Sequence, residues 1–113
     1  MIEEKESDLV QIITIDFETY YDKNFSLSKL TTEEYINDTQ FQVIGVGVKL
    51  NHNASQWFSG THDEIRDWLQ QFDWYKSLAV AHNAAFDAAI LNWHFGIKPR
   101  RWLDTLSLAR AVD

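Results

Sequence analysis

The sequence predicts an α/β fold built on a mixed sheet of about five strands flanked by helices. Segments rich in β-branched residues alternate along the chain with segments of helical periodicity, which is typical of a sheet covered by helices. Two Thr-x-x-Glu capping boxes mark the starts of helices. With 113 residues, of which 45% are hydrophobic, the chain can bury one modest core. We therefore expect one domain spanning residues 1–113.

The first half of the chain predicts three strands and a short helix. Residues 9–17 (LVQIITIDF) are rich in β-branched residues and predict a strand that is buried on both faces. Thr31, with Glu34 three residues later, predicts the start of a short helix. Residues 41–50 (FQVIGVGVKL) and 54–60 (ASQWFSG), separated by a turn, predict two further strands. A meander of three antiparallel strands is the simplest way to join them.

The second half of the chain begins with an amphipathic helix, expected from Thr61 to Gln71. Thr61 and Glu64 form the second capping box. Apolar side chains then recur at helical spacing, and a helix with this pattern buries one face against the core. These side chains are Ile65, Trp68, Leu69 and Phe72.

Two short strands and two helices are expected to complete the fold. Residues 77–82 (SLAVAH) predict a strand, and residues 83–95 (NAAFDAAILNWHF) an alanine-rich helix that ends at Gly96. Residues 100–104 (RRWLD) predict the last strand, which a helical segment at 105–112 follows. Connections that contain a helix place the first, fourth and fifth strands side by side and parallel. The expected sheet therefore combines three antiparallel strands with two parallel ones.

Charge and composition exclude several classes of protein. The formal net charge of -7 argues against binding nucleic acid through a basic surface, but it is compatible with a nuclease whose acidic centre is neutralised by metal ions. The chain has no cysteine, and therefore no disulfide framework and no thiolate zinc site. No apolar run approaches the ~18 residues of a membrane span, and the acidic start MIEEKESD is unlike a signal peptide. We expect a cytoplasmic protein that does not bind membranes.

Two carboxylates, Asp16 and Glu18, stand one residue apart where the first predicted strand ends. The two-residue period of a strand places them on one face, about 6–7 Å apart along the chain, so both can reach one pair of divalent ions. Carboxylates at a strand end are usually just solvated. In an apolar, central strand, however, ionised carboxylates are costly unless a cation lies nearby. This position therefore favours a metal site.

A second polar cluster follows the fourth predicted strand. His82 and Asn83 end that strand, and Asp87 falls in the first turns of the next helix. Because the carboxyl ends of parallel strands form the ligand crevice of an open α/β sheet, we expect Asp87 to face the same crevice as Asp16. The alternative is structural: Asn83 caps the helix, and Asp87 interacts favourably with the helix dipole.

Together, the segments DFET and HNAAFDAAIL resemble the first and second motifs of the DnaQ-like, or DEDD, 3′ to 5′ exonucleases of the ribonuclease H-like superfamily. The strand order expected above is the one that this family uses. The longer run of residues 15–50 is similar to the N-terminal proofreading domain of bacteriophage-type family A DNA polymerases. The resemblance covers the chain from Ile12 to Val112, and it implies a ribonuclease H-like sheet.

The resemblance implies roles for residues of both motifs. Asp16, Glu18 and Asp87 become metal ligands and catalytic residues. Two Mg²⁺ or Mn²⁺ ions are implied as cofactors, one activating the attacking water and the other stabilising the leaving 3′ oxygen. The substrate is the 3′ end of single-stranded DNA. The residues implied to lie near its terminal nucleotide are Phe17, Thr19, His82, Asn83 and Phe86.

The family also has a third motif, which this sequence lacks. That motif is a Tyr or His followed by a fourth carboxylate on a later helix, and no counterpart occurs before Asp113. Residues 1–113 are therefore expected to be a partial exonuclease domain without its C-terminal helix. Its expected partner is a polymerase domain on the same or another chain. Asp104 is expected to be structural, capping the next helix or bracing the site.

Two alternative functions stay open. One is an RNA-processing enzyme of the same ribonuclease H-like fold. RNA differs from DNA by its 2′-hydroxyl, and the sequence identifies no residue that would recognise this group. The other is a non-catalytic domain that binds DNA ends or supports a polymerase.

Overall fold

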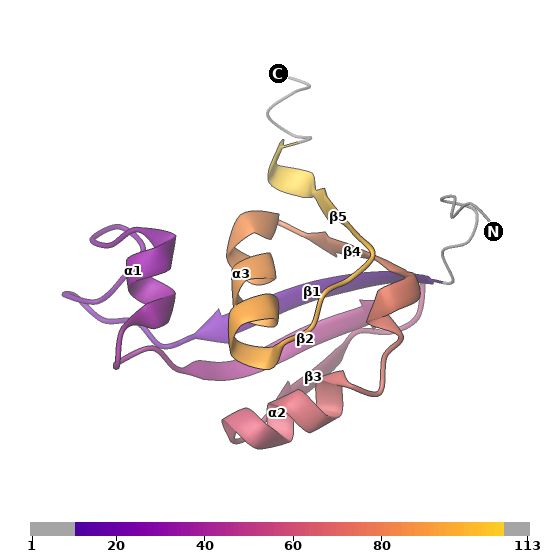
Figure 1. Cartoon of the computed structure of the whole chain (residues 1–113), viewed down its shortest axis with the longest axis horizontal. Coiled ribbons are helices and arrows are strands. Elements are labelled where there is room, and N and C mark those ends of the chain that lie inside the picture. The colour runs from indigo at the N-terminus through magenta and orange to yellow at the C-terminus, as the bar shows by residue number, and fades with distance from the viewer. Residues whose placement is uncertain (1–10, 108–113) are drawn as a thin grey trace.

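The computed structural model describes residues 11–107, which form a five-stranded mixed sheet with helices packed against it (Figure 1). The strands are β1 (Gln11–Thr19), β2 (Val43–Leu50), β3 (Gln56–Ser59), β4 (Ser77–Ala81) and β5 (Arg101–Asp104). Their order in the sheet is β3-β2-β1-β4-β5. β1, β2 and β3 form an antiparallel meander, while β4 lies parallel to β1 and β5 parallel to β4. The predicted α/β class and mixed five-stranded sheet are confirmed.

The helices are α1 (Thr32–Asn37), α2 (His62–Leu69), the 3₁₀ turn η2 (Trp74–Lys76) and α3 (Ala84–Phe95). Two of the helices, α1 and α2, begin where the capping boxes predict. Thr31 and Thr61 each accept a hydrogen bond from the backbone amide of the glutamate three residues on, and that glutamate's carboxylate accepts one from the threonine's amide. α3 ends at Gly96, which adopts the left-handed conformation that favours glycine.

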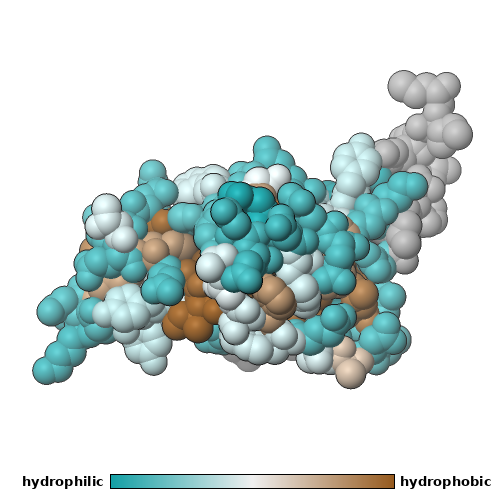
Figure 2. All heavy atoms as spheres, turned by 90° about the horizontal axis from the view of Figure 1, so that it is seen from below, coloured by the Kyte–Doolittle hydropathy of each residue, from teal (hydrophilic) through white to brown (hydrophobic). Residues whose placement is uncertain are grey.

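The segment after β5 becomes helical at residues 105–107, as predicted, and residues 108–112 of that predicted helix lie outside the described residues. Within residues 11–107, no helix has the length and apolar character needed to cross a bilayer. Figure 2 shows the side of the molecule seen from below, where a mostly hydrophilic surface surrounds a few hydrophobic patches.

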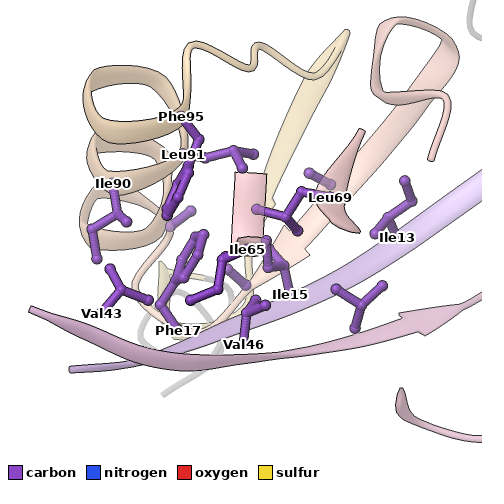
Figure 3. Close-up of a cluster of buried hydrophobic side chains, with 14 of the residues drawn as sticks. Ile13, Ile15, Phe17, Val43, Val46, Ile65, Leu69, Ile90, Leu91 and Phe95 are labelled. Atoms are coloured by element: carbon purple, nitrogen blue, oxygen red, sulfur yellow. The ribbon is translucent and has the colours of Figure 1, made fainter. Parts of the chain in front are cut away.

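The hydrophobic core lies between the sheet and the layer formed by α2 and α3 (Figure 3). From β1, Ile13, Ile15 and Phe17 point into this layer and are almost fully buried. The ring of Phe17 stacks on Phe95 of α3, with the ring centroids 5.7 Å apart. The other core side chains labelled in Figure 3 are Val43, Val46, Ile65, Leu69, Ile90 and Leu91.

The prediction that the first strand is buried on both faces is wrong. In β1, buried residues alternate with exposed ones, and Ile12 keeps 45% of its surface exposed. The physical reason is that the core side chains of α2 and α3 pack against Ile13, Ile15 and Phe17, whereas the alternate residues of β1, at positions 12, 14, 16 and 18, are exposed. Asp16 and Glu18 lie on the open face, where their partners on β2 are Gly47 and Gly45. Neither carboxylate is therefore buried in the core.

Candidate active site

The site forms where β1 extends past the end of its neighbour β4. β4 pairs with β1 only as far as Thr14, which lies beside Val80, whereas β1 continues to Thr19. Beyond Thr14, β1 therefore has no strand on that side to satisfy its backbone. The first turn of α3 fills this position, and Asp87 Oδ1 accepts a hydrogen bond of 3.1 Å from the amide of Phe17. The carboxylate of Asp87 thus lies beside β1, at the level of the sheet.

This hydrogen bond brings the three predicted carboxylates into one region. Phe17 is the residue between Asp16 and Glu18, so Asp87 is joined to the backbone between them. Asp87 is a buried charged residue, 3% exposed, whereas Asp16 and Glu18 are exposed. The hydrogen bond places Asp87 beside the part of β1 that carries Asp16, and the expectation that both carboxylates face one crevice stays a prediction.

The carboxylates repel one another electrostatically. Burial raises the pKa of Asp87 to about 7, the hydrogen bond from Phe17 partly opposes that rise, and the charges of Asp16 and Glu18 add to it. The pKa of Glu18 is also raised, first by desolvation and then by the charge and the hydrogen-bonding side chain of Asp16. A bound cation would relieve this repulsion, because opposite charge favours the ionised form of a carboxyl group.

The carboxylates do not form a closed metal site in this conformation. Within residues 11–107, no three His, Cys, Asp or Glu side chains lie close enough together to hold an ion. Asp87 is fixed by its hydrogen bond, but the exposed side chains of Asp16 and Glu18 can change rotamer toward it. Carboxylate oxygens are the ligands that Mg²⁺ and other hard cations prefer. The donor set fits such an ion, and the ligand roles of the three residues stay predictions.

A pocket of about 280 Å³ opens beside Glu18. It is lined by Phe17, Glu18, Thr19, Tyr21, Ser26, Leu27, Tyr35 and Phe86. Three of the predicted substrate-binding residues, Phe17, Thr19 and Phe86, therefore line one hollow. Phe17 contributes least, because its ring is 4% exposed and belongs to the core. The remaining lining is mainly aromatic and apolar, which suits a flat ring next to a carboxylate.

A second pocket, of about 390 Å³, opens beside Asp16. His82 lines it together with Asp16 and Thr105, and His82 Nδ1 lies 3.1 Å from Thr105 Oγ1. The structure thus places His82 next to one of the predicted metal ligands. Since Asp16 lines this pocket and Glu18 lines the other, the carboxylate pair lies between two hollows.

Asn83 lies in the turn between β4 and α3 and adopts the left-handed conformation, with φ 72°. Asparagine tolerates this conformation better than most residues. Asn83 holds the N-cap position, but its side chain makes no capping hydrogen bond. Asn83 is therefore the N-cap residue of α3, as the structural alternative expects, but it caps the helix without a side-chain hydrogen bond, and the residue is exposed.

Asp104 provides the capping interactions, as predicted. Its Oδ1 accepts hydrogen bonds of 3.0 Å from the amides of Asn83 and Leu106, and its Oδ2 accepts one from Ser107 Oγ. Desolvation raises the pKa of Asp104, but these hydrogen bonds outweigh it and leave the pKa below its ordinary value. Asp104 thus braces the turn that carries Asn83 and begins the helical segment at Thr105.

Sequence reasoning missed Tyr35, which α1 places against the site. Its hydroxyl lies 2.8 Å from Thr19 Oγ1 and donates to the carbonyl of Tyr20. The apolar pair Tyr35 and Ile36 in α1 identifies Tyr35 as a core residue, but nothing in the local pattern indicates a contact with a residue 16 positions earlier.

The fold and site define an α/β domain with three carboxylates at the open end of its central strand. No protein-family model matches the chain, and no curated protein matches its sequence. Any functional assignment therefore depends on the resemblance of the two motifs and on the geometry described above.

Proposed function

We propose that the protein is a metal-dependent 3′ to 5′ exonuclease module of ribonuclease H-like fold, the proofreading part of a DNA polymerase. The observation that carries the proposal is the hydrogen bond from the Phe17 amide to Asp87. It brings the acidic residue of the second motif to the strand that carries both acidic residues of the first. A purely structural helix-dipole role for Asp87 would not require this contact across the fold.

The three carboxylates act together as metal ligands in this proposal. Asp16 and Glu18 turn toward Asp87, and the three groups together bind two Mg²⁺ or Mn²⁺ ions. Such ions activate a water molecule and stabilise the leaving 3′ oxygen during phosphodiester hydrolysis. Asp87 holds its carboxylate in place through the Phe17 amide, so it needs no reorientation.

The two pockets give the substrate a path across the carboxylates. The terminal nucleotide occupies the aromatic pocket beside Glu18, where Phe86 and Thr19 contact it. His82 lies beside Asp16 in the second pocket, and Asn83 follows it in the exposed turn that begins α3. The negative net charge is consistent with a site that depends on metal ions to hold phosphate. The module works in the cytoplasm with a polymerase domain on the same or another chain.

The test is release of 3′ nucleotides from a labelled single-stranded oligonucleotide in Mn²⁺. Asp16→Asn and Asp87→Asn are each expected to lower the rate by about 100-fold or more, because they remove ligands that the reaction requires. Asp67→Asn, on an exposed position of α2, is the matched control and should leave the rate unchanged.

The same assay separates the alternatives. Faster release from RNA than from DNA would favour the RNA-processing enzyme. Binding of single-stranded ends without any release would favour the non-catalytic domain. If the wild-type protein shows no metal-dependent release or binding, the proposal is wrong.

A further inference from the structure

Tyr35 is held rigidly beside the pocket that Glu18 lines. The side chain is 2% exposed, and its ring stacks on Phe25 with centroids 4.6 Å apart. It also packs edge-on against Phe41 and lies 6.2 Å from the ring of Phe86, which lines the same pocket. These contacts fix the ring, so the position of its hydroxyl is fixed as well.

The hydrogen bonds of Tyr35 have only one possible direction. A tyrosine hydroxyl carries a single hydrogen. That hydrogen is donated to the carbonyl oxygen of Tyr20, because a carbonyl can only accept. The bond between Tyr35 and Thr19 must therefore use the hydrogen of Thr19. The two hydrogen bonds thus form a chain, in which Thr19 donates to Tyr35 and Tyr35 donates to the carbonyl oxygen of Tyr20.

Thr19 consequently has only lone pairs left to offer to the pocket. Glu18, the charged residue of the lining, is also an acceptor when ionised. We propose that Tyr35 is a positioning residue that orients the Thr19 hydroxyl, so that the pocket selects a ligand bringing a hydrogen-bond donor. This inference rests on the proposed function, since it identifies that donor as the free hydroxyl on the terminal sugar of a nucleic-acid strand.

The test compares two oligonucleotides that differ only at the terminal 3′ position. One carries a 3′-hydroxyl and the other a 3′-fluorine, which is similar in size but cannot donate a hydrogen bond. Dissociation constants are measured by fluorescence anisotropy, with Ca²⁺ in place of Mg²⁺. We expect the wild-type protein to bind the hydroxyl end about 3- to 10-fold more tightly, as for one hydrogen bond.

Two variants separate the positioning role from general damage. Tyr35→Phe keeps the buried ring but frees the Thr19 hydrogen, and the preference should fall below about 2-fold. Thr19→Val, which removes the acceptor, should reduce it similarly. Tyr75→Phe, at a residue that is 66% exposed, should keep the wild-type preference.

The outcomes distinguish this inference from the proposed function. If both ends bind with equal affinity in a metal-dependent manner, the inference is wrong and the proposed function stands. If Tyr35→Phe keeps the wild-type preference, Tyr35 does not act through Thr19. If neither end binds with metal, the proposed function and this inference both fail.

Discussion

Asp87 Oδ1 and the backbone amide of Phe17 are joined by a hydrogen bond between residues 70 positions apart. This contact ties the first turn of α3 to the part of β1 that β4 leaves unpaired. It also keeps a carboxyl group buried near two other carboxyl groups, where its ionisation is unfavourable. The burial of Asp87 therefore reduces the stability of the apoprotein at neutral and alkaline pH, where this carboxyl group ionises.

Asp87→Asn is expected to stabilise the protein at alkaline pH. The pKa of Asp87 is raised to about 7 from 3.8, so the folded state holds the proton more tightly than the unfolded state. The resulting stabilisation is complete below about pH 4 and is lost as the pH rises through about 7. The full difference corresponds to at most roughly 4 kcal/mol.

The measurement is urea unfolding of both proteins, without metal, across this pH range. Asparagine keeps an oxygen that can accept from Phe17 but carries no charge. The variant should gain stability relative to wild type as the pH rises from 4 to 8.5, by on the order of 1–3 kcal/mol. If the difference in unfolding free energy between the two proteins does not change with pH, the ionised carboxylate of Asp87 does not destabilise the folded state.

Metal ions are expected to stabilise the wild-type protein more at pH 8 than at pH 6. Ligand carboxylates must be ionised, and protons compete for Asp87 below its pKa of about 7. At 100 times the dissociation constant, an ion that binds only the folded state adds about 2.7 kcal/mol. Thermal unfolding with Mn²⁺ and with chelator measures the gain. Asp16→Asn should remove most of it, and an equal gain in that variant would exclude Asp16 from the site.

Much of the fold follows from local sequence patterns, whereas the detail of the site does not. The two capping boxes involve residues three positions apart, so Thr31 and Thr61 identify their helices directly. The contact of Asp87 with Phe17 depends on where β4 ends beside β1, and no local pattern records that length. The motif residues indicated the region of the candidate site, whose function stays a proposal. The direction of the Thr19 hydrogen bond, in contrast, depends on Tyr35 and could not be read from the sequence.

The sequence did not predict that one face of β1 is exposed, because Ile12, one of the residues on that face, is apolar. Ile12 is a β-branched residue in a strand of similar residues, so its exposure has no signature in the sequence. The polar residues at positions 14, 16 and 18 do follow the two-residue period of a half-buried strand. Ile12 is thus exposed, whereas its neighbour Ile13 is fully buried.

Ile13→Ala and Ile12→Ala should differ sharply in their effect on stability. Ile13 is fully buried between the sheet and the helix layer, so its truncation leaves a cavity and should cost about 2–5 kcal/mol. Ile12 is exposed, and its substitution should change stability by roughly 0.5 kcal/mol or less. Urea unfolding of both variants provides the measurement. A large loss for Ile12→Ala would show that this face is covered in solution.

Thr31→Ala and Thr61→Ala remove equivalent caps from two helices, but only one of these helices carries a residue of the candidate site. Each substitution should cost about 1 kcal/mol, because an N-cap threonine satisfies a backbone amide of the first turn. α1 positions Tyr35, whose hydroxyl contacts Thr19, whereas α2 contributes Ile65 and Leu69 to the core away from that pocket. Thr31→Ala should therefore also weaken the preference for a 3′-hydroxyl end, and Thr61→Ala should leave it intact. Unfolding and anisotropy measurements on the same preparations separate the two effects. If both variants lose the preference equally, the loss reflects general destabilisation, and α1 has no particular role in orienting Tyr35.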